Sequence, residues 1–99
     1  MTGIDLIVKE REEQLGKHGY TLENDKKYNM HEMLVLIEFL LKDPNDAEAD
    51  ELKVWLTTGH SGIKFTEAFI AKLEGKSRVE KYAIAGAFVA AEIDRLQSI

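Results

Sequence analysis

Apolar residues recur every three or four positions along most of the chain, and this spacing predicts amphipathic helices. Strand-like alternation of apolar and polar residues is scarce, and Pro44 is the one proline. Short polar segments with turn-forming residues separate the apolar stretches, which indicates four or five helices. The predicted fold class is all-α, with one compact helical bundle that forms a single domain over residues 1–99.

Capping residues and turn residues set the expected boundaries of these helices. Thr2 and Ser61 are candidate N-caps, and Ser77 with Glu80 forms a capping box three residues apart. Residues 16–28 are expected to form the one long irregular segment. The helices are expected from Thr2 to Gly16, from Asn29 to about Lys42, from Asn45 or Asp46 to Gly59, from Ser61 to Gly75 and from Ser77 to Ile99.

The last expected helix is apolar nearly all round, which indicates that other elements cover most of its surface. Small residues repeat along it at positions 83, 87 and 91 and again at positions 86 and 90, so neighbouring helices can approach it closely. We therefore place this helix at the centre of the bundle. Because a chain of 99 residues offers limited cover, we expect the small-residue stripes to contribute to a homo-oligomer.

Charge and composition narrow the range of partners. The net charge is −5 and the isoelectric point is about 5.2, which argues against broad nucleic-acid binding and membrane-surface binding, since both need a basic face. No apolar stretch is long enough to span a bilayer, and the first residues lack the features of a signal peptide. There is no cysteine to form disulfides. We expect a cytoplasmic protein, in the host cell if a phage encodes it.

Two segments near the ends of the chain together resemble a known family. The first contains E-R-E-E-Q at 10–14, H-G-Y-T at 18–21 and E-N-D at 23–25, and the second is A-G-A-F-V-A-A-E-I-D-R-L at 85–96. They resemble small phage and prophage proteins with the patterns E-R-x-x-Q, E-G-[WY]-T-x-E-x-D-D and A-G-A-x-x-A-A-E-I-[DE]-R-L. This resemblance implies a phage-type accessory protein.

The leading functional hypothesis is a non-enzymatic accessory protein that binds a small nucleotide-derived ligand or a host defence protein, and so counters bacterial defence. Tyr20 and Tyr28 offer flat faces for a base, while Glu23 and Asp25 offer acceptors for sugar hydroxyls. The alternative is a loop that its apolar residues pin to the bundle, with its acids in solvent. The candidate ligand-binding residues are Arg11, Tyr20, Glu23, Asp25, Tyr28, Arg78 and Lys81, with no cofactor.

The basic candidates have structural alternatives as well. Arg78 and Lys81 lie near the start of the last helix, where an oligomer would repeat them and build a phosphate pocket between subunits. In a monomer the same residues are ordinary surface charges. Arg11 occupies an apolar position of the helical period, so we expect a packed stem and a head that meets a carboxylate such as Glu92 or Asp94.

The alternative function is enzymatic. MazG-like nucleoside triphosphate pyrophosphohydrolases hold Mg²⁺ with E-x-x-E followed by E-x-x-D, and the metal activates a water for attack on a phosphate. Glu10 and Glu13 match the first half of that pattern. The second half is missing, because the two acids of the last helix are two residues apart and splay around it. We expect no catalytic residues, and Mg²⁺ only under this alternative, at Glu10, Glu13, Glu32 and Glu38.

Overall fold

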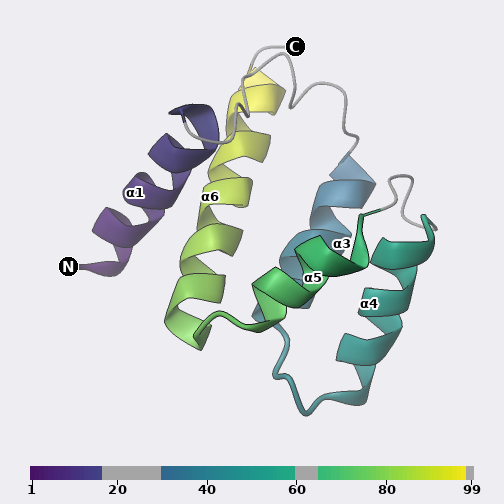
Figure 1. The fold of residues 1–99 in the computed structure, drawn as a ribbon. Coiled ribbons are helices and arrows are strands. Elements are labelled where there is room, and N and C mark those ends of the chain that lie inside the picture. The colour runs from purple at the N-terminus through teal and green to yellow at the C-terminus, as the bar shows by residue number, and fades with distance from the viewer. Residues whose placement is uncertain (17–29, 60–64, 98–99) are drawn as a thin grey trace.

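The computed structural model describes residues 1–16, 30–59 and 65–97, and these residues form five α-helices and no strand (Figure 1). The all-α prediction is therefore confirmed. The long segment 16–28 lies outside the described residues apart from Gly16. The helices are α1 (Gly3–Gly16), α3 (Met30–Leu41), α4 (Ala47–Thr58), α5 (Glu67–Glu74) and α6 (Arg78–Gln97).

The last helix, α6, is central in the bundle, as the sequence predicts. It lies between α1 and α3 and packs against both (Figure 1). On the far side of α3 lies α4, and α5 crosses in front of α3 between α4 and α6. The N-terminal helix α1 runs in the same direction as α6, and its main contacts are with that helix.

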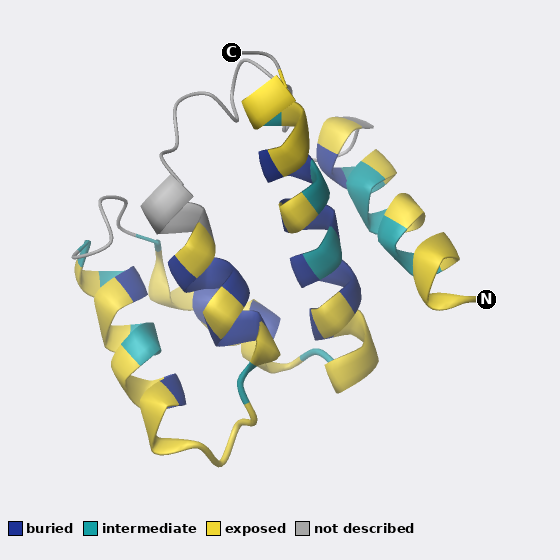
Figure 2. Cartoon of the chain, turned by 180° about the vertical axis from the view of Figure 1, so that it is seen from behind, coloured by how far each residue is buried: buried dark blue, intermediate teal, exposed yellow. Residues whose placement is uncertain are grey.

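The hydrophobic core forms where α3, α4, α5 and α6 meet. Figure 2 shows the buried residues on the sides of these helices that face one another. The largest fully buried side chains are Leu36, Leu40, Leu56 and Ile70. Each contributes about 1.5–3 kcal/mol by its removal from water, so these four anchor α3, α4 and α5 to one another.

Two of the predicted N-terminal caps are present as reciprocal hydrogen bonds. The backbone N–H of Asp5 donates to Thr2 Oγ1 (3.1 Å), and the N–H of Thr2 donates to Asp5 Oδ2 (3.0 Å). At the start of α6, the N–H of Glu80 donates to Ser77 Oγ (3.2 Å), and the Ser77 hydroxyl donates in return to Glu80 Oε1 (3.1 Å). Asp46 caps α4, and Gly59 ends it at a positive φ of 85°. The expected start of the second helix at Asn29 falls outside the described residues.

The start of α5 differs from the prediction. The helix begins at Glu67, and Thr66 caps it with a side chain that accepts from the N–H of Phe69 (3.1 Å). Phe65 precedes the helix, and its N–H donates to the carbonyl of Leu56 (2.8 Å) at the end of α4. The predicted range of 61–75 placed Phe65 within the helix, whereas it lies before the helix and stacks on Phe69 with ring centroids 5.5 Å apart.

The small-residue stripe of α6 lies inside the chain. Ala83, Ala87 and Ala91 are buried within the single chain. Beside them, α1 approaches α6 so closely that a Cβ atom on Gly86 would lie 2.7 Å from Ile7 Cδ1. The three alanines are therefore covered within the same chain and are not available to a second subunit. Gly86 and Ala90 of the other stripe are half-buried, and their contribution to contacts between subunits stays a prediction.

Candidate functional site

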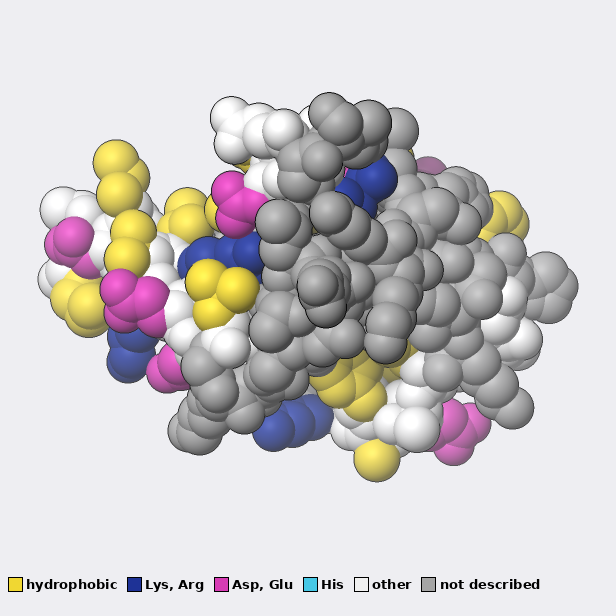
Figure 3. Space-filling model, turned by 90° about the horizontal axis from the view of Figure 1, so that it is seen from above, with side chains coloured by type: hydrophobic (Ala, Val, Ile, Leu, Met, Phe, Trp, Pro, Cys, Tyr) yellow, Lys and Arg dark blue, Asp and Glu magenta, His cyan; other side chains and the backbone are white. Residues whose placement is uncertain are grey.

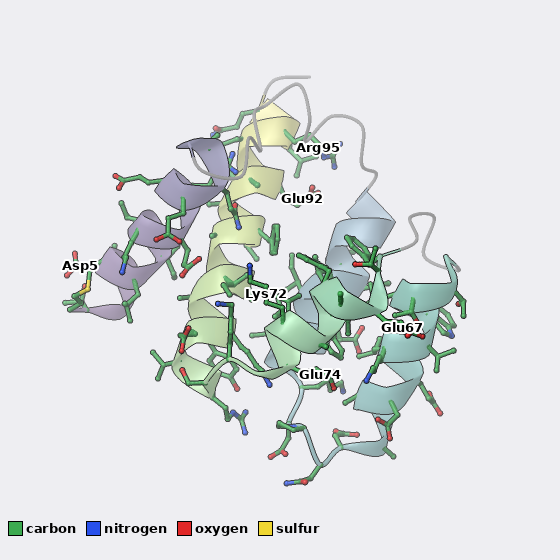
Figure 4. All side chains as sticks on the ribbon, in the orientation of Figure 1. Asp5, Glu67, Lys72, Glu74, Glu92 and Arg95 are labelled. Carbon is green, nitrogen blue, oxygen red and sulfur yellow. The ribbon has the colours of Figure 1, made fainter. Side chains whose placement is uncertain are left out.

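A groove of about 250 Å³ lies between α1, α5 and α6. Its floor is apolar and its rim carries charges of both signs. The residues of the floor are Phe69, Leu73, Ile84 and Phe88. The polar residues of the rim are Glu10, Glu13, Gln14, Lys72 and Lys76. In Figure 4, Lys72 lies on the side of α5 that faces α6. We call this feature the α1/α5/α6 groove.

The local sequence explains how each side chain reaches the groove. Glu10 and Glu13 are three residues apart on α1, so both project from one side of that helix. Lys72 lies in the last turn of α5, and Lys76 follows Gly75, the C-cap of α5. Lys72 could not be recognised as a site residue from the sequence, because a lysine beside an apolar stripe is ordinary for an amphipathic helix and does not indicate a site.

The charges of the groove are largely available to a ligand. Glu10, Glu13 and Lys72 form no ion pair with another described residue, and Lys76 Nζ lies 3.8 Å from Glu80 Oε2. Lysine ammonium groups bind phosphates, and carboxylates accept hydrogen bonds from hydroxyl or amino groups. The volume is near the lower end of the range for small-molecule pockets, about 300–1,000 Å³. The groove therefore suits one small ligand that carries both an anion and polar hydrogens.

Arg11 holds α1 to α6, as its position in the helical period predicts. Its Nη2 lies 3.2 Å from Asp94 Oδ2, which is one of the two expected carboxylates. Its Nη1 also donates to Gln14 Oε1 (3.3 Å), and Gln14 is buried. The stem and head of Arg11 are mostly covered, so its guanidinium stabilises the contact between the two helices.

The other basic candidates lie at the opposite end of α6. Arg78 is exposed, forms an ion pair with Asp43 (3.2 Å) and donates to Tyr82 Oη (2.6 Å). The hydrogen bond to Tyr82, with the charge of Asp43, raises the pKa of Arg78 above its ordinary value. Lys81 is largely buried along its length.

Within one chain, Arg11 is not brought together with Arg78 and Lys81, the other candidates among the described residues. Between Arg78 and Asp94, the partner of Arg11, α6 rises about 24 Å, which exceeds the reach of one small pocket. A single site that uses both arginines requires a second chain or a long ligand. The other four candidates, Tyr20, Glu23, Asp25 and Tyr28, lie outside the described residues.

The acids near the C-terminal end of α6 take part in ion pairs. Glu92 is buried and accepts from Arg95, whose Nη2 lies 3.1 Å from Glu92 Oε2. Both side chains extend from the last turns of α6 toward the side on which α3 lies (Figure 4). Asp94 points instead to Arg11 on α1. As the spacing of two predicts, Glu92 and Asp94 lie on different faces of the helix.

The carboxylates of the alternative magnesium site divide between two regions. Glu10 and Glu13 line the α1/α5/α6 groove, whereas Glu38 lines a second groove between α3 and α4 and lies 4.0 Å from Lys42 Nζ. The side chain of Glu32 is not among those described. In the described part of the chain, no group of three or more histidines, aspartates or glutamates is placed to hold a metal ion.

Comparison with known proteins does not indicate a function for this chain, so the candidate site is chosen from the geometry. No protein family, curated protein or solved structure matches this chain. Among the described helices, none is both long and apolar enough to cross a membrane. The α1/α5/α6 groove is therefore the candidate site, because of the charged and apolar residues that line it.

Proposed function

We propose that the chain is a non-enzymatic, phage-type accessory protein that binds a small nucleotide-derived ligand and thereby counters bacterial defence. The phage setting is supported by the sequence resemblance at the two ends of the chain. The observation that carries ligand binding is the α1/α5/α6 groove, in which Lys72 and Lys76 line the same apolar groove as Glu10 and Glu13. The cytoplasm of the host cell is the compartment in which such a ligand occurs.

Each part of a nucleotide finds a complementary group in this groove. Lys72 and Lys76 supply positive charge for a phosphate. Phe69 supplies an aromatic surface for a base, and stacking of this kind contributes about 1–3 kcal/mol. Glu10 and Glu13 accept hydrogen bonds from ribose hydroxyls. This arrangement binds a ligand without the clustered carboxylates that metal-assisted hydrolysis requires.

We also propose that the protein acts as a homo-oligomer. The chain is short, and several large apolar side chains on α1 and α6 are exposed in the single chain. Ala83, Ala87 and Ala91 are buried within the chain, so the oligomer requires a surface other than these residues.

A thermal-shift screen with cyclic nucleotides and ADP-ribose derivatives tests ligand binding. A ligand at about 100 times its Kd contributes about 2.7 kcal/mol, which raises the Tm of a domain of this size by about 10 °C or more. We expect this rise for the wild type and its loss in the Lys72→Ala/Lys76→Ala double variant. Lys9→Ala is the matched control, because Lys9 is an exposed lysine of α1 that does not line the groove.

The recovered ligand distinguishes binding from catalysis. Chromatography after incubation should return the ligand unchanged, with or without Mg²⁺. If no nucleotide raises the Tm, ligand binding is wrong, and binding to a host defence protein takes its place. Magnesium-dependent release of pyrophosphate, lost in Glu10→Gln, would instead establish the MazG-like alternative, for which Glu10 and Glu13 already share the groove with two lysines.

A further inference from the structure

Large apolar side chains of α1 and α6 are exposed along one stripe of each helix. Their exposed fractions range from 43% to 82%. On α1 they are Met1, which precedes the helix, with Ile4, Val8 and Leu15, and on α6 they are Val79, Tyr82, Val89, Ile93 and Leu96. We call these nine residues the α1/α6 face. Successive positions along each stripe are three or four residues apart when Arg11 is counted in the α1 stripe and Gly86 in the α6 stripe. This is the heptad spacing of helices that pack against other helices.

Both stripes lie on the same side of the helix pair. The line of contact between the helices passes through Ile7 and Gly86. At about 100° per residue, Glu10 and Ile84, which line the α1/α5/α6 groove, lie on one side of that line. By the same rotation, the helical residues of both stripes fall on the other side, except Val79, which lies close to the line. Figure 3 shows hydrophobic side chains on the outer part of the molecule at the left, where α1 lies.

The middle of the face carries little charge that a partner would have to desolvate, and at its Val79 end Arg78 lies over the Tyr82 ring and is paired with Asp43. Arg11 is the charged residue at a heptad position of the α1 stripe, and it is already paired with Asp94 of the same chain. On α6, no residue from Tyr82 to Ala91 is charged. Burial of this face therefore gains the hydrophobic free energy without leaving unpaired charges in an apolar contact.

We infer that the α1/α6 face binds the same face of a second copy of this chain, so that the two helix pairs form a four-helix arrangement. Nine side chains at about half exposure present roughly 800 Å² of surface, which is the area per partner of a standard stable interface. A symmetric dimer needs a patch that complements itself, and an uncharged apolar stripe does so even in a protein of net charge −5. This inference rests on the proposed homo-oligomer and is independent of ligand binding.

Light scattering coupled to size-exclusion chromatography tests the inference with two matched variants. The wild type at micromolar concentration should have twice the 11.2 kDa mass of one chain. Val89→Glu should weaken dimerisation by about 100-fold or more, because each dimer would bury two unpaired carboxylates. Val54→Glu is the control, since Val54 is a similarly exposed helical valine on α4, outside the face, and this variant should remain dimeric.

The possible outcomes distinguish an error in the proposed interface from an error in the proposed homo-oligomer. Circular dichroism verifies that each variant is folded, and Ile93→Lys provides a second disruption of the face if Val89→Glu fails to fold. A dimer that persists in the folded variants overturns this face while leaving the proposed homo-oligomer intact. A wild type that stays monomeric at all concentrations overturns both, and the face would then belong to the interface with a different protein.

Discussion

At the scale of single residues, Gly86 shows how one position decides the approach of two helices. Glycine in the middle of a helix costs about 1 kcal/mol of helix propensity relative to alanine, so its presence in α6 needs a compensating contact. The side chain of Ile7 supplies that contact, since its Cδ1 and Cγ1 atoms occupy the space that a Cβ atom would need, at 2.7 and 2.8 Å. The sequence indicated a packing reason, and the packing proves to be within the chain.

We expect Gly86→Ala to destabilise the protein by about 1 kcal/mol, because overpacking costs about 1–3 kcal/mol and the gain in helix propensity offsets part of it. In an Ile7→Ala background the same substitution should stabilise by about 1 kcal/mol, since the clash is gone and the propensity gain remains. Urea denaturation of the double-mutant cycle measures the coupling. Gly75→Ala is the control, because its Cβ would meet its nearest atoms at an ordinary 3.7 Å. Equal effects of Gly86→Ala in both backgrounds would contradict the contact.

At the scale of elements, local capping chemistry located most of the described helix starts. The reciprocal bonds at Thr2 and Ser77 and the cap at Asp46 involve residues three or fewer positions apart, so they can be recognised without knowledge of the fold. The start of α5 could not be located in this way. Phe65 continues the apolar spacing of α5, and only its hydrogen bond to Leu56 on α4 shows that it lies outside the helix.

Thr66→Ala should destabilise the protein by about 1 kcal/mol, the usual cost of the loss of an N-cap side chain. The helix α5 has only eight residues, so it has little propensity of its own to offset that loss. Chemical denaturation measures the effect. Thr57→Ala provides the comparison, because the Thr57 hydroxyl donates back to the carbonyl of Lys53 (2.9 Å) within α4, and its loss should cost much less. An equal loss in the free energy of unfolding of the two variants would contradict a specific contribution of the Thr66 cap.

At the scale of the whole molecule, the chain presents two different surfaces on either side of the α1/α6 contact. The side toward α5 carries the charged groove, and the other side carries the apolar α1/α6 face. A purely structural interaction protein would have an apolar patch without a pocket, whereas this chain combines the two. Ligand binding and dimerisation can therefore occur together, because they use separate sides of the same helix pair.

A dimer that forms through the α1/α6 face should make thermal stability depend on protein concentration. Because association stabilises the folded chain by mass action, a tenfold increase in concentration should raise the Tm of the wild type by a few degrees. The Tm of Val89→Glu should not change over the same range, and that of Val54→Glu should follow the wild type. Differential scanning calorimetry at several concentrations measures this. A wild-type Tm that is independent of concentration would contradict the dimer.

Periodicity and capping were sufficient to predict the helices, the all-α class and the central place of the last helix. Both act between residues a few positions apart, so the linear sequence contains the information directly. The contacts between helices required the fold. The spacing of Ala83, Ala87 and Ala91 tells which residues share a side of α6, but it does not tell which helix covers that side. In the fold these three alanines are buried within the chain, and the neighbouring Gly86 packs against Ile7 of α1, at the far end of the chain.

The groove could not be predicted from the sequence for the same reason. Glu10 and Lys72 are separated by more than half of the chain, and neither has a neighbour in sequence that indicates the other. Their approach follows from the packing of α1 and α6 beside α5, which is driven by burial of apolar side chains and not by the charges themselves. The sequence of each helix was thus sufficient to predict its extent and its apolar side. The approach of charged residues that are distant in sequence was a consequence of how the apolar surfaces pack.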